Sequence, residues 1–207
     1  VPVLKEINLH IMPGENVALV GSTGAGKSTL VTLIHRFADV SKGRITVDGH
    51  DIRDVTRHSL SSQISMVLQE PYLFSGTVAS NIRYNNENIS DDEVVTAAKT
   101  VGAHDFIMSL DFGYNTILAE RGINLSVGQR QLLSFARAVA GDPRVIILDE
   151  ATANIDTHTE VLIQQALQQV LKGRTSIVIA HRPSVEKVVV GSGGFMFERM
   201  RMSEYGE

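Results

Sequence analysis

The chain has 207 residues, 43% apolar and 20% charged, which is typical of a folded domain and argues against disorder. Its net charge of −4 argues against nucleic-acid binding, which usually needs clustered lysine and arginine side chains. Because it has no cysteine, disulfides and thiolate metal sites are excluded, and no apolar stretch approaches the ~18 residues of a membrane span.

The first seventy residues alternate between strand and helix patterns. An apolar run over 16–20 predicts a buried strand, which leads through a glycine-rich loop into a helix predicted over 29–37. Residues 44–47, followed by Asp48-Gly49, predict a strand and a turn. A further strand is predicted over 64–68.

The rest of the chain divides into a helical part and a return to strands. Helices are predicted over 91–101 and 104–110, with Ser90 or Asp91 as the N-cap. Strands over 145–148 and 175–179 enclose a helix over 157–171, and residues 188–190 and 195–199 predict a short hairpin. Such alternation indicates an α/β fold with a mostly parallel sheet. We expect one domain, with a core lobe of residues 1–71 and 141–207 and a helical subdomain over about 72–140.

A glycine-rich motif, Gly21-Ser-Thr-Gly-Ala-Gly-Lys27-Ser28, lies between the first predicted strand and helix. It fits G-x-x-x-x-G-K-[ST], a loop whose N–H groups and following helix N-terminus cradle a polyphosphate. The motif assigns Lys27 to the β- and γ-phosphates and the Ser28 hydroxyl to Mg²⁺. The predicted phosphate-binding residues are Gly21, Ser22, Thr23, Gly24, Ala25, Gly26, Lys27, Ser28 and Thr29.

An acidic pair, Asp149-Glu150, follows the apolar strand predicted over 145–148. Ligands of open α/β sheets bind at the carboxyl ends of the strands, so this pair is expected beside the phosphates. Asp149 would hold Mg²⁺, directly or through water, and Glu150 would act as the general base on the attacking water. Together the two motifs predict a P-loop nucleotidase of unspecified kind.

A third motif, Leu125-Ser-Val-Gly-Gln129, precedes an amphipathic helix predicted over 131–140. It resembles the signature of ATP-binding cassette (ABC) transporter domains, with Val127 where glycine or glutamine is more usual. Taken alone, Ser126 is equally typical of an ordinary helix N-cap. The resemblance extends over residues 3–182 in the family's order and spacing, and it is nearest to bacterial lipid and multidrug exporters.

The resemblance implies roles for residues that would otherwise attract no attention. Gln69 matches the Q-loop glutamine, which senses Mg²⁺ and the attacking water and links to the membrane domain. Asp156 matches the D-loop aspartate and acts across the dimer, and His181 matches the switch histidine, which contacts the γ-phosphate. The segment 119–122 resembles the one that exporters use to contact their membrane helices.

The resemblance also implies ATP and Mg²⁺ as cofactors and two partners. One partner is a second nucleotide-binding domain, identical or different, packed head to tail so that each copy completes the other's site. The residues acting in trans would be Leu125, Ser126, Gly128, Gln129 and Asp156. The other partner is a transmembrane domain, expected in the same parent polypeptide because the chain begins at Val1 with no initiator Met. ATP hydrolysis would then drive export from the cytoplasmic side of the inner (plasma) membrane.

Two departures from the family pattern leave alternatives open. No aromatic residue precedes Phe37, whereas family members stack one on adenine upstream of the P-loop strand, and the segment after His181 is shorter than usual. These features and Val127 also fit a nucleotide-binding regulatory or assembly module with little turnover. An ABC-type DNA-repair or chromosome ATPase fits less well, because no extended heptad run of a coiled coil is present.

Overall fold

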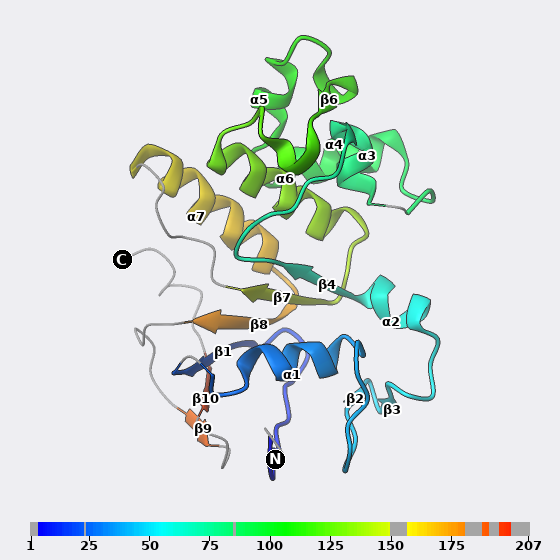
Figure 1. Cartoon of the computed structure of the whole chain (residues 1–207), viewed down its shortest axis with the longest axis vertical. Coiled ribbons are helices and arrows are strands. Elements are labelled where there is room, and N and C mark those ends of the chain that lie inside the picture. Colours follow the sequence, from blue (N-terminus) through cyan, green and yellow to red (C-terminus); the bar gives the residue numbers. More distant parts are fainter. Residues whose placement is uncertain are drawn as a thin grey trace.

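A six-stranded sheet runs through the molecule, and the computed structural model describes residues 4–22, 24–84, 86–149, 157–180, 188–190 and 195–199 (Figure 1). The strands in spatial order are β4 (Ile64–Val67), β7 (Val145–Asp149), β8 (Thr175–Ala180), β1 (Asn16–Gly21), β10 (Phe195–Arg199) and β9 (Val188–Val190). The first four are parallel, and β10 is antiparallel to both of its neighbours. The predicted α/β class, the parallel sheet and the terminal hairpin are confirmed.

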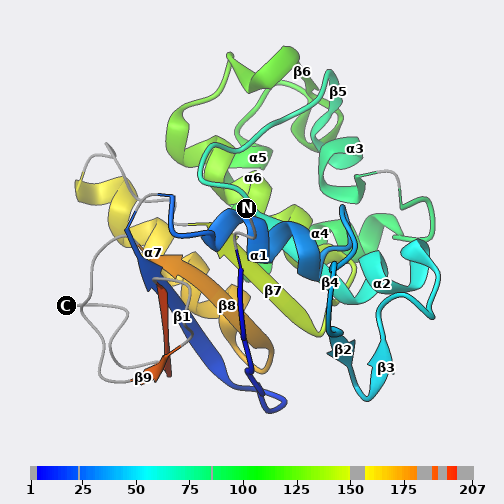
Figure 2. The same ribbon diagram turned by 60° about the horizontal axis from the view of Figure 1, so that its bottom comes forward.

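Helices cover both faces of the parallel strands (Figures 1 and 2). On one face lie α1 (Lys27–Ile34) and α2 (Arg57–Gln63), and on the other lie α6 (Val127–Ala140) and α7 (Thr157–Leu171). Because side chains alternate along a strand, Ile147 packs with the α1 and α2 side, while Ile146 and Leu148 pack with the α6 and α7 side. The run over 145–148 is therefore apolar throughout because its strand is buried on both faces.

The remaining helices gather around α6 at the end of the molecule away from the hairpin of β2 (Thr46–Val47) and β3 (His50–Asp51) (Figure 1). They are α3 (Val78–Arg83), α4 (Asp91–Thr100), α5 (His104–Met108) and the 3₁₀ turns η1 (Gly113–Asn115) and η2 (Glu120–Gly122), beside the paired strands β5 (Gly76–Thr77) and β6 (Ile117–Leu118). Ser90 is the N-cap of α4 and forms a capping box with Glu93. Buried residues of this segment share one core cluster with one face of the sheet. The subdomain boundaries at 72 and 140 stay predictions.

Several predicted elements differ from those observed. The strand predicted over 44–47 is shorter, β2 (Thr46–Val47), and the predicted turn is confirmed, because Asp48 and Gly49 both have positive φ and lead into a further strand, β3 (His50–Asp51). Helix α1 begins at Lys27 and ends at Ile34, and the helix predicted over 131–140 begins at Val127. Within the described residues, no helix has the length and apolarity needed to cross a bilayer.

Candidate functional site

The sheet register aligns the ends of four parallel strands at one edge. Asp149 at the end of β7 is opposite Ile179 in β8, and Ala180, the last residue of β8, is opposite Val20 in β1. The ends of β7 and β1 are therefore two strand spacings apart, about 10 Å. On the other side of β7, Val67 of β4 is opposite Leu148, so Gln69 follows at the same edge. The sheet brings the predicted Q-loop glutamine, Asp149 and the P-loop to a single edge.

Helix α1, which follows the P-loop, has no side-chain cap at its N-terminus. Gly26 is the N-cap of α1 in a left-handed conformation, with φ 102° and ψ 8°, and no side chain caps the first turn. Gly24 also has a positive φ of 82°, which an L side chain rarely adopts. The first intrahelical bond runs from the Leu30 N–H to the Gly26 carbonyl, 3.0 Å long. The N–H groups of the preceding turn, Lys27 to Thr29, have no acceptor earlier in the helix and can bind an anion.

Lys27 is folded onto the loop that precedes it. The residue is buried, and its Nζ donates to the carbonyl of Gly21 at 2.5 Å and to that of Ser22 at 3.1 Å. These carbonyls hold the ammonium group inside the loop where the phosphate-binding pattern requires a positive charge. Ser28, in contrast, is exposed at the start of α1. A cation near the loop can reach its hydroxyl.

The signature motif forms the N-terminus of α6, and its serine is the cap. The Ser126 hydroxyl accepts from the Gln129 N–H at 3.2 Å, and Gln129 Oε1 accepts from the Ser126 N–H at 3.0 Å. The sequence left open whether Ser126 is an ordinary helix N-cap, and this capping box shows that it is one. The N–H groups of Val127 and Gly128 remain without an acceptor earlier in the helix. Capping and anion binding are therefore compatible, since they use different N–H groups.

The backbone after the Q-loop is held by the far end of the signature helix. Arg137 in α6 donates from Nη1 to the Tyr72 carbonyl at 2.8 Å, from Nε to the Asn81 carbonyl at 2.8 Å and from Nη2 to Asn81 Oδ1 at 3.0 Å. The buried Asn81 side chain in turn bonds both the N–H and the carbonyl of Phe74, each at 2.8 Å. Burial lowers the pKa of Arg137. Sequence reasoning missed this Arg137–Asn81 network, because no motif links residues so far apart in the chain.

The predicted membrane-contact segment lies against the same backbone. The Arg121 N–H donates to the Leu73 carbonyl at 2.9 Å, and the Tyr72 hydroxyl donates to Glu120 Oε1 at 3.4 Å. Gly122 has a φ of +62°, and a Cβ there would come within 2.8 Å of the Leu73 side chain. The segment 119–122 and the backbone three to five residues after Gln69 therefore form one surface.

Four predicted site residues lie outside the described residues: Thr23, Glu150, Asp156 and His181. Of the others, Asp149 is half-buried at the end of β7, and Gln69 is exposed. Within the described part, no three His, Cys, Asp or Glu side chains form a group that could hold a metal by themselves. Exposed Ser28 and half-buried Asp149, with Gln69 at the same edge of the sheet, fit instead a Mg²⁺ that arrives with phosphate oxygens as its other ligands.

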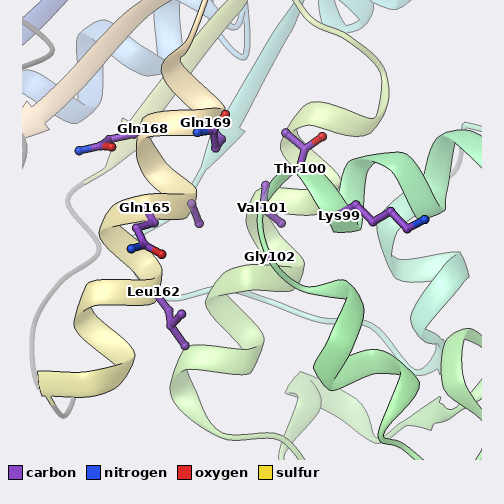
Figure 3. A pocket seen from close by; sticks show the side chains of 9 residues that line it. Lys99, Thr100, Val101, Gly102, Leu162, Gln165, Gln168 and Gln169 are labelled. Carbon is purple, nitrogen blue, oxygen red and sulfur yellow. The ribbon is translucent and has the colours of Figure 1, made fainter.

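A pocket of about 370 Å³ lies elsewhere, between the C-terminal end of α4 and α7 (Figure 3). Its lining comes from the segment Lys99 to Gly102 and from α7 residues that include Leu162 and Gln165. None of the predicted site residues lines it. We place the candidate site at the P-loop, where the charge and the free N–H groups are found.

These features define a P-loop nucleotide-binding protein, and the comparisons with known proteins identify its class. The ABC transporter family profile matches residues 4–153, so the chain belongs to the ABC transporter family. It is 51% identical over 183 residues to an ATP-dependent lipid A-core flippase of Syntrophus aciditrophicus, covering 88% of this chain and 30% of the relative. It is 50% identical over 184 residues to ABC transporter B family member 4 of Dictyostelium discoideum, covering 89% and 24%.

A solved structure gives the same result. A bacterial Atm1-family ABC exporter with ATP bound matches with a TM-score of 0.77 and 42% identity, over 87% of this chain and 32% of that chain. The chain therefore has the fold of an ABC exporter's nucleotide-binding domain. It spans about a quarter to a third of the length of the relatives named here.

Proposed function

We propose that this chain binds ATP with Mg²⁺, hydrolyses it, and drives export through a transmembrane partner on the cytoplasmic side of the membrane. The observation that carries the proposal is the P-loop: a left-handed glycine cap, a first helical turn of free N–H groups, and the buried ammonium of Lys27. This arrangement offers several donors and one fixed charge to the β- and γ-phosphates of a triphosphate.

The residues at this edge of the sheet have separate roles in the proposed reaction. Lys27 stabilises negative charge on the transferred phosphoryl group, and the α1 N–H groups orient the phosphate chain. Ser28, Gln69 and Asp149 would hold Mg²⁺, which when bound would neutralise negative charge on the phosphates. Glu150 takes the proton of the attacking water, helped by His181, and Gln69 orients that water.

A second copy completes the site in the proposed head-to-tail dimer. The N–H groups of Val127 and Gly128 remain available in α6, and the Ser126 hydroxyl can still donate while it caps the helix. These donors would close over the γ-phosphate held by the other copy, with Leu125 and Gln129 supporting the turn and Asp156 acting across the dimer. The two-fold symmetry gives two equivalent sites.

The transmembrane partner is proposed to dock on the surface formed by segment 119–122 and the backbone after Gln69. Three aromatic side chains are exposed there, Tyr72 at 38%, Phe74 at 45% and Tyr84 at 53%. Phe74 contacts Tyr72 edge to face with ring centroids 4.9 Å apart, and Tyr84 at 5.5 Å. Exposed aromatic rings with a polar surround are typical of protein–protein contacts. A motion of Gln69 at the nucleotide would reach the membrane domain through this surface.

A phosphate-release assay on the purified chain tests the catalytic part. We expect sustained Mg²⁺-dependent turnover that is lost in Lys27→Ala and kept in Lys99→Ala, a control on the last turn of α4. Turnover by Lys27→Ala at the parent rate would refute the assignment of the P-loop. Nucleotide binding without turnover would favour the regulatory or assembly module. For the export part, membrane-spanning segments upstream of Val1 in the parent reading frame are expected, and their absence would contradict a transmembrane domain in the same polypeptide.

A further inference from the structure

The first turn of the signature helix packs against the first turn of α7. An added Cβ at Gly128 would overlap the Cγ2 methyl of Thr159 and lie 3.5 Å from the Thr159 Cβ. Thr is branched at Cβ and has few rotamers in a helix, so this methyl has little freedom to move aside. Glycine is therefore the residue that position 128 accepts while Thr159 faces it.

The contact joins two parts of the proposed trans site. Gly128 supplies one of the α6 N–H groups that remain free for a phosphate. Thr159 lies in the first turn of α7, three residues after Asp156, the predicted D-loop aspartate. The two helices continue side by side, with Leu132 and Phe135 of α6 in one core cluster with Ile163 of α7. The start of α7 is thus in direct contact with the first turn of α6.

We infer that Thr159 is a positioning residue of the composite nucleotide site, and that its methyl, not the space needed by a phosphate, is what requires glycine at position 128. The inference rests on the proposed function, because the composite site belongs to that proposal. It gives the signature glycine a partner within its own chain. A smaller residue at position 159 should then permit a larger one at position 128.

The test is a double-variant cycle of Gly128→Ala and Thr159→Ser, with unfolding by urea and ATP turnover as readouts. The serine side chain of Thr159→Ser keeps a hydroxyl but lacks the methyl, so the nearest remaining atoms are the Cβ at 3.5 Å and the hydroxyl oxygen at 3.8 Å, which are ordinary contact distances. Alanine is a better helix former than glycine. We therefore expect Gly128→Ala to destabilise the parent and to stabilise the Thr159→Ser background.

Turnover should follow the same pattern. A displacement of about 1 Å in a catalytic group can cost up to 10²-fold in rate, so we expect Gly128→Ala to lower kcat roughly tenfold or more in the parent. In the Thr159→Ser background, the same change should leave kcat within about threefold of Thr159→Ser alone, since residues in contact are not independent. ATP affinity of the single chain, measured by equilibrium binding, should not change, because the P-loop is untouched. A general loss of folded structure would lower both kcat and the ATP affinity.

Two controls separate steric from general effects. Thr159→Val keeps a methyl at the same place and should not rescue Gly128→Ala. Gly141→Ala, at the other end of α6, adds a Cβ with nothing within 4 Å and should leave turnover at the parent rate. Rescue by serine but not by valine supports the inference. Equal losses of stability and turnover on Gly128→Ala in both backgrounds overturn the inference. A parent chain without turnover would instead refute the proposed function, and the unfolding measurements alone would then decide whether Gly128 and Thr159 are coupled.

Discussion

Replacing Arg137 tests whether the signature helix and the Q-loop backbone behave as one unit. The guanidinium makes three hydrogen bonds of 2.8–3.0 Å to Tyr72 and Asn81. Its central carbon also lies 4.7 Å from the Tyr84 ring centroid and 5.8 Å from that of Phe74. Arg137→Met removes all of these interactions while keeping a long side chain. Arg137→Lys keeps the charge but not the planar set of donors.

The expected cost follows from the contacts. A hydrogen bond to a charged group contributes about 1.5–3 kcal/mol, and a partly exposed cation–π contact about 0.5–1 kcal/mol. Since these bonds share one side chain and do not add fully, we expect Arg137→Met to lower the free energy of unfolding by about 3–5 kcal/mol. Lysine can satisfy one or two of the three acceptors, so Arg137→Lys should cost about 2 kcal/mol.

Urea unfolding followed by circular dichroism measures these differences, provided that the m-value stays constant. The matched control is Arg53→Met, which removes an arginine whose partner Asp51 lies two residues away at 2.7 Å. The two groups form a bidentate pair at the surface, which should contribute less to stability than the Arg137 network. If Arg137→Met costs no more than Arg53→Met, the network does not hold the segment after the Q-loop and our reasoning is wrong.

Three further predictions concern the base, the caps and one half-buried histidine. Glu150→Gln should slow ATP turnover roughly 10²–10⁴-fold. It should also leave a long-lived ATP-bound dimer, detected by size-exclusion chromatography. Turnover at the parent rate would exclude Glu150 as the base. Ser126→Ala and Ser90→Ala each remove a helix cap and should each cost about 1 kcal/mol of stability, but only Ser126→Ala should also lower turnover. Burial lowers the pKa of His35 below 6.5, so the unfolded chain takes up a proton first as the pH falls, and stability should fall below pH 6.5. His35→Gln should make the free energy of unfolding less dependent on pH between about 7.5 and 5.5, and an unchanged slope would contradict this account.

Local rules predicted the strands and helices that carry the site. The observed bounds of α7 match the prediction, and the P-loop lies between strand and helix as its motif requires. The predicted start of α6 was wrong by four residues, although Ser126 and Gln129 fit a capping box. The amphipathic pattern is clear only from Gln131 onward, and the predicted start followed this pattern instead of the capping residues.

Elements that depend on distant contacts could not be predicted. Helix α2 buries Leu60 alone, so its sequence carries no apolar periodicity. The paired strands β5 and β6 have two residues each and are forty residues apart in the chain. The contact of Gly128 with Thr159 likewise depends on how two helices cross, which spacing alone does not determine.

The two helix N-termini of the proposed site differ in a way that suits their different tasks. At α1 the cap is a glycine with no side-chain acceptor, so three successive N–H groups and the Lys27 charge remain for the phosphates. At α6 the serine cap already uses the Gln129 N–H, so only two N–H groups and one hydroxyl hydrogen remain, and the guanidinium of the neighbouring Arg130 already donates to the Leu125 carbonyl at 2.6 Å. An anion should therefore bind the α1 end first, in a single chain, and the weaker α6 end should add to binding only when a second copy presents it. Assembly of the proposed dimer would then depend on the triphosphate, and loss of the γ-phosphate on hydrolysis would remove the contact that holds the two copies together.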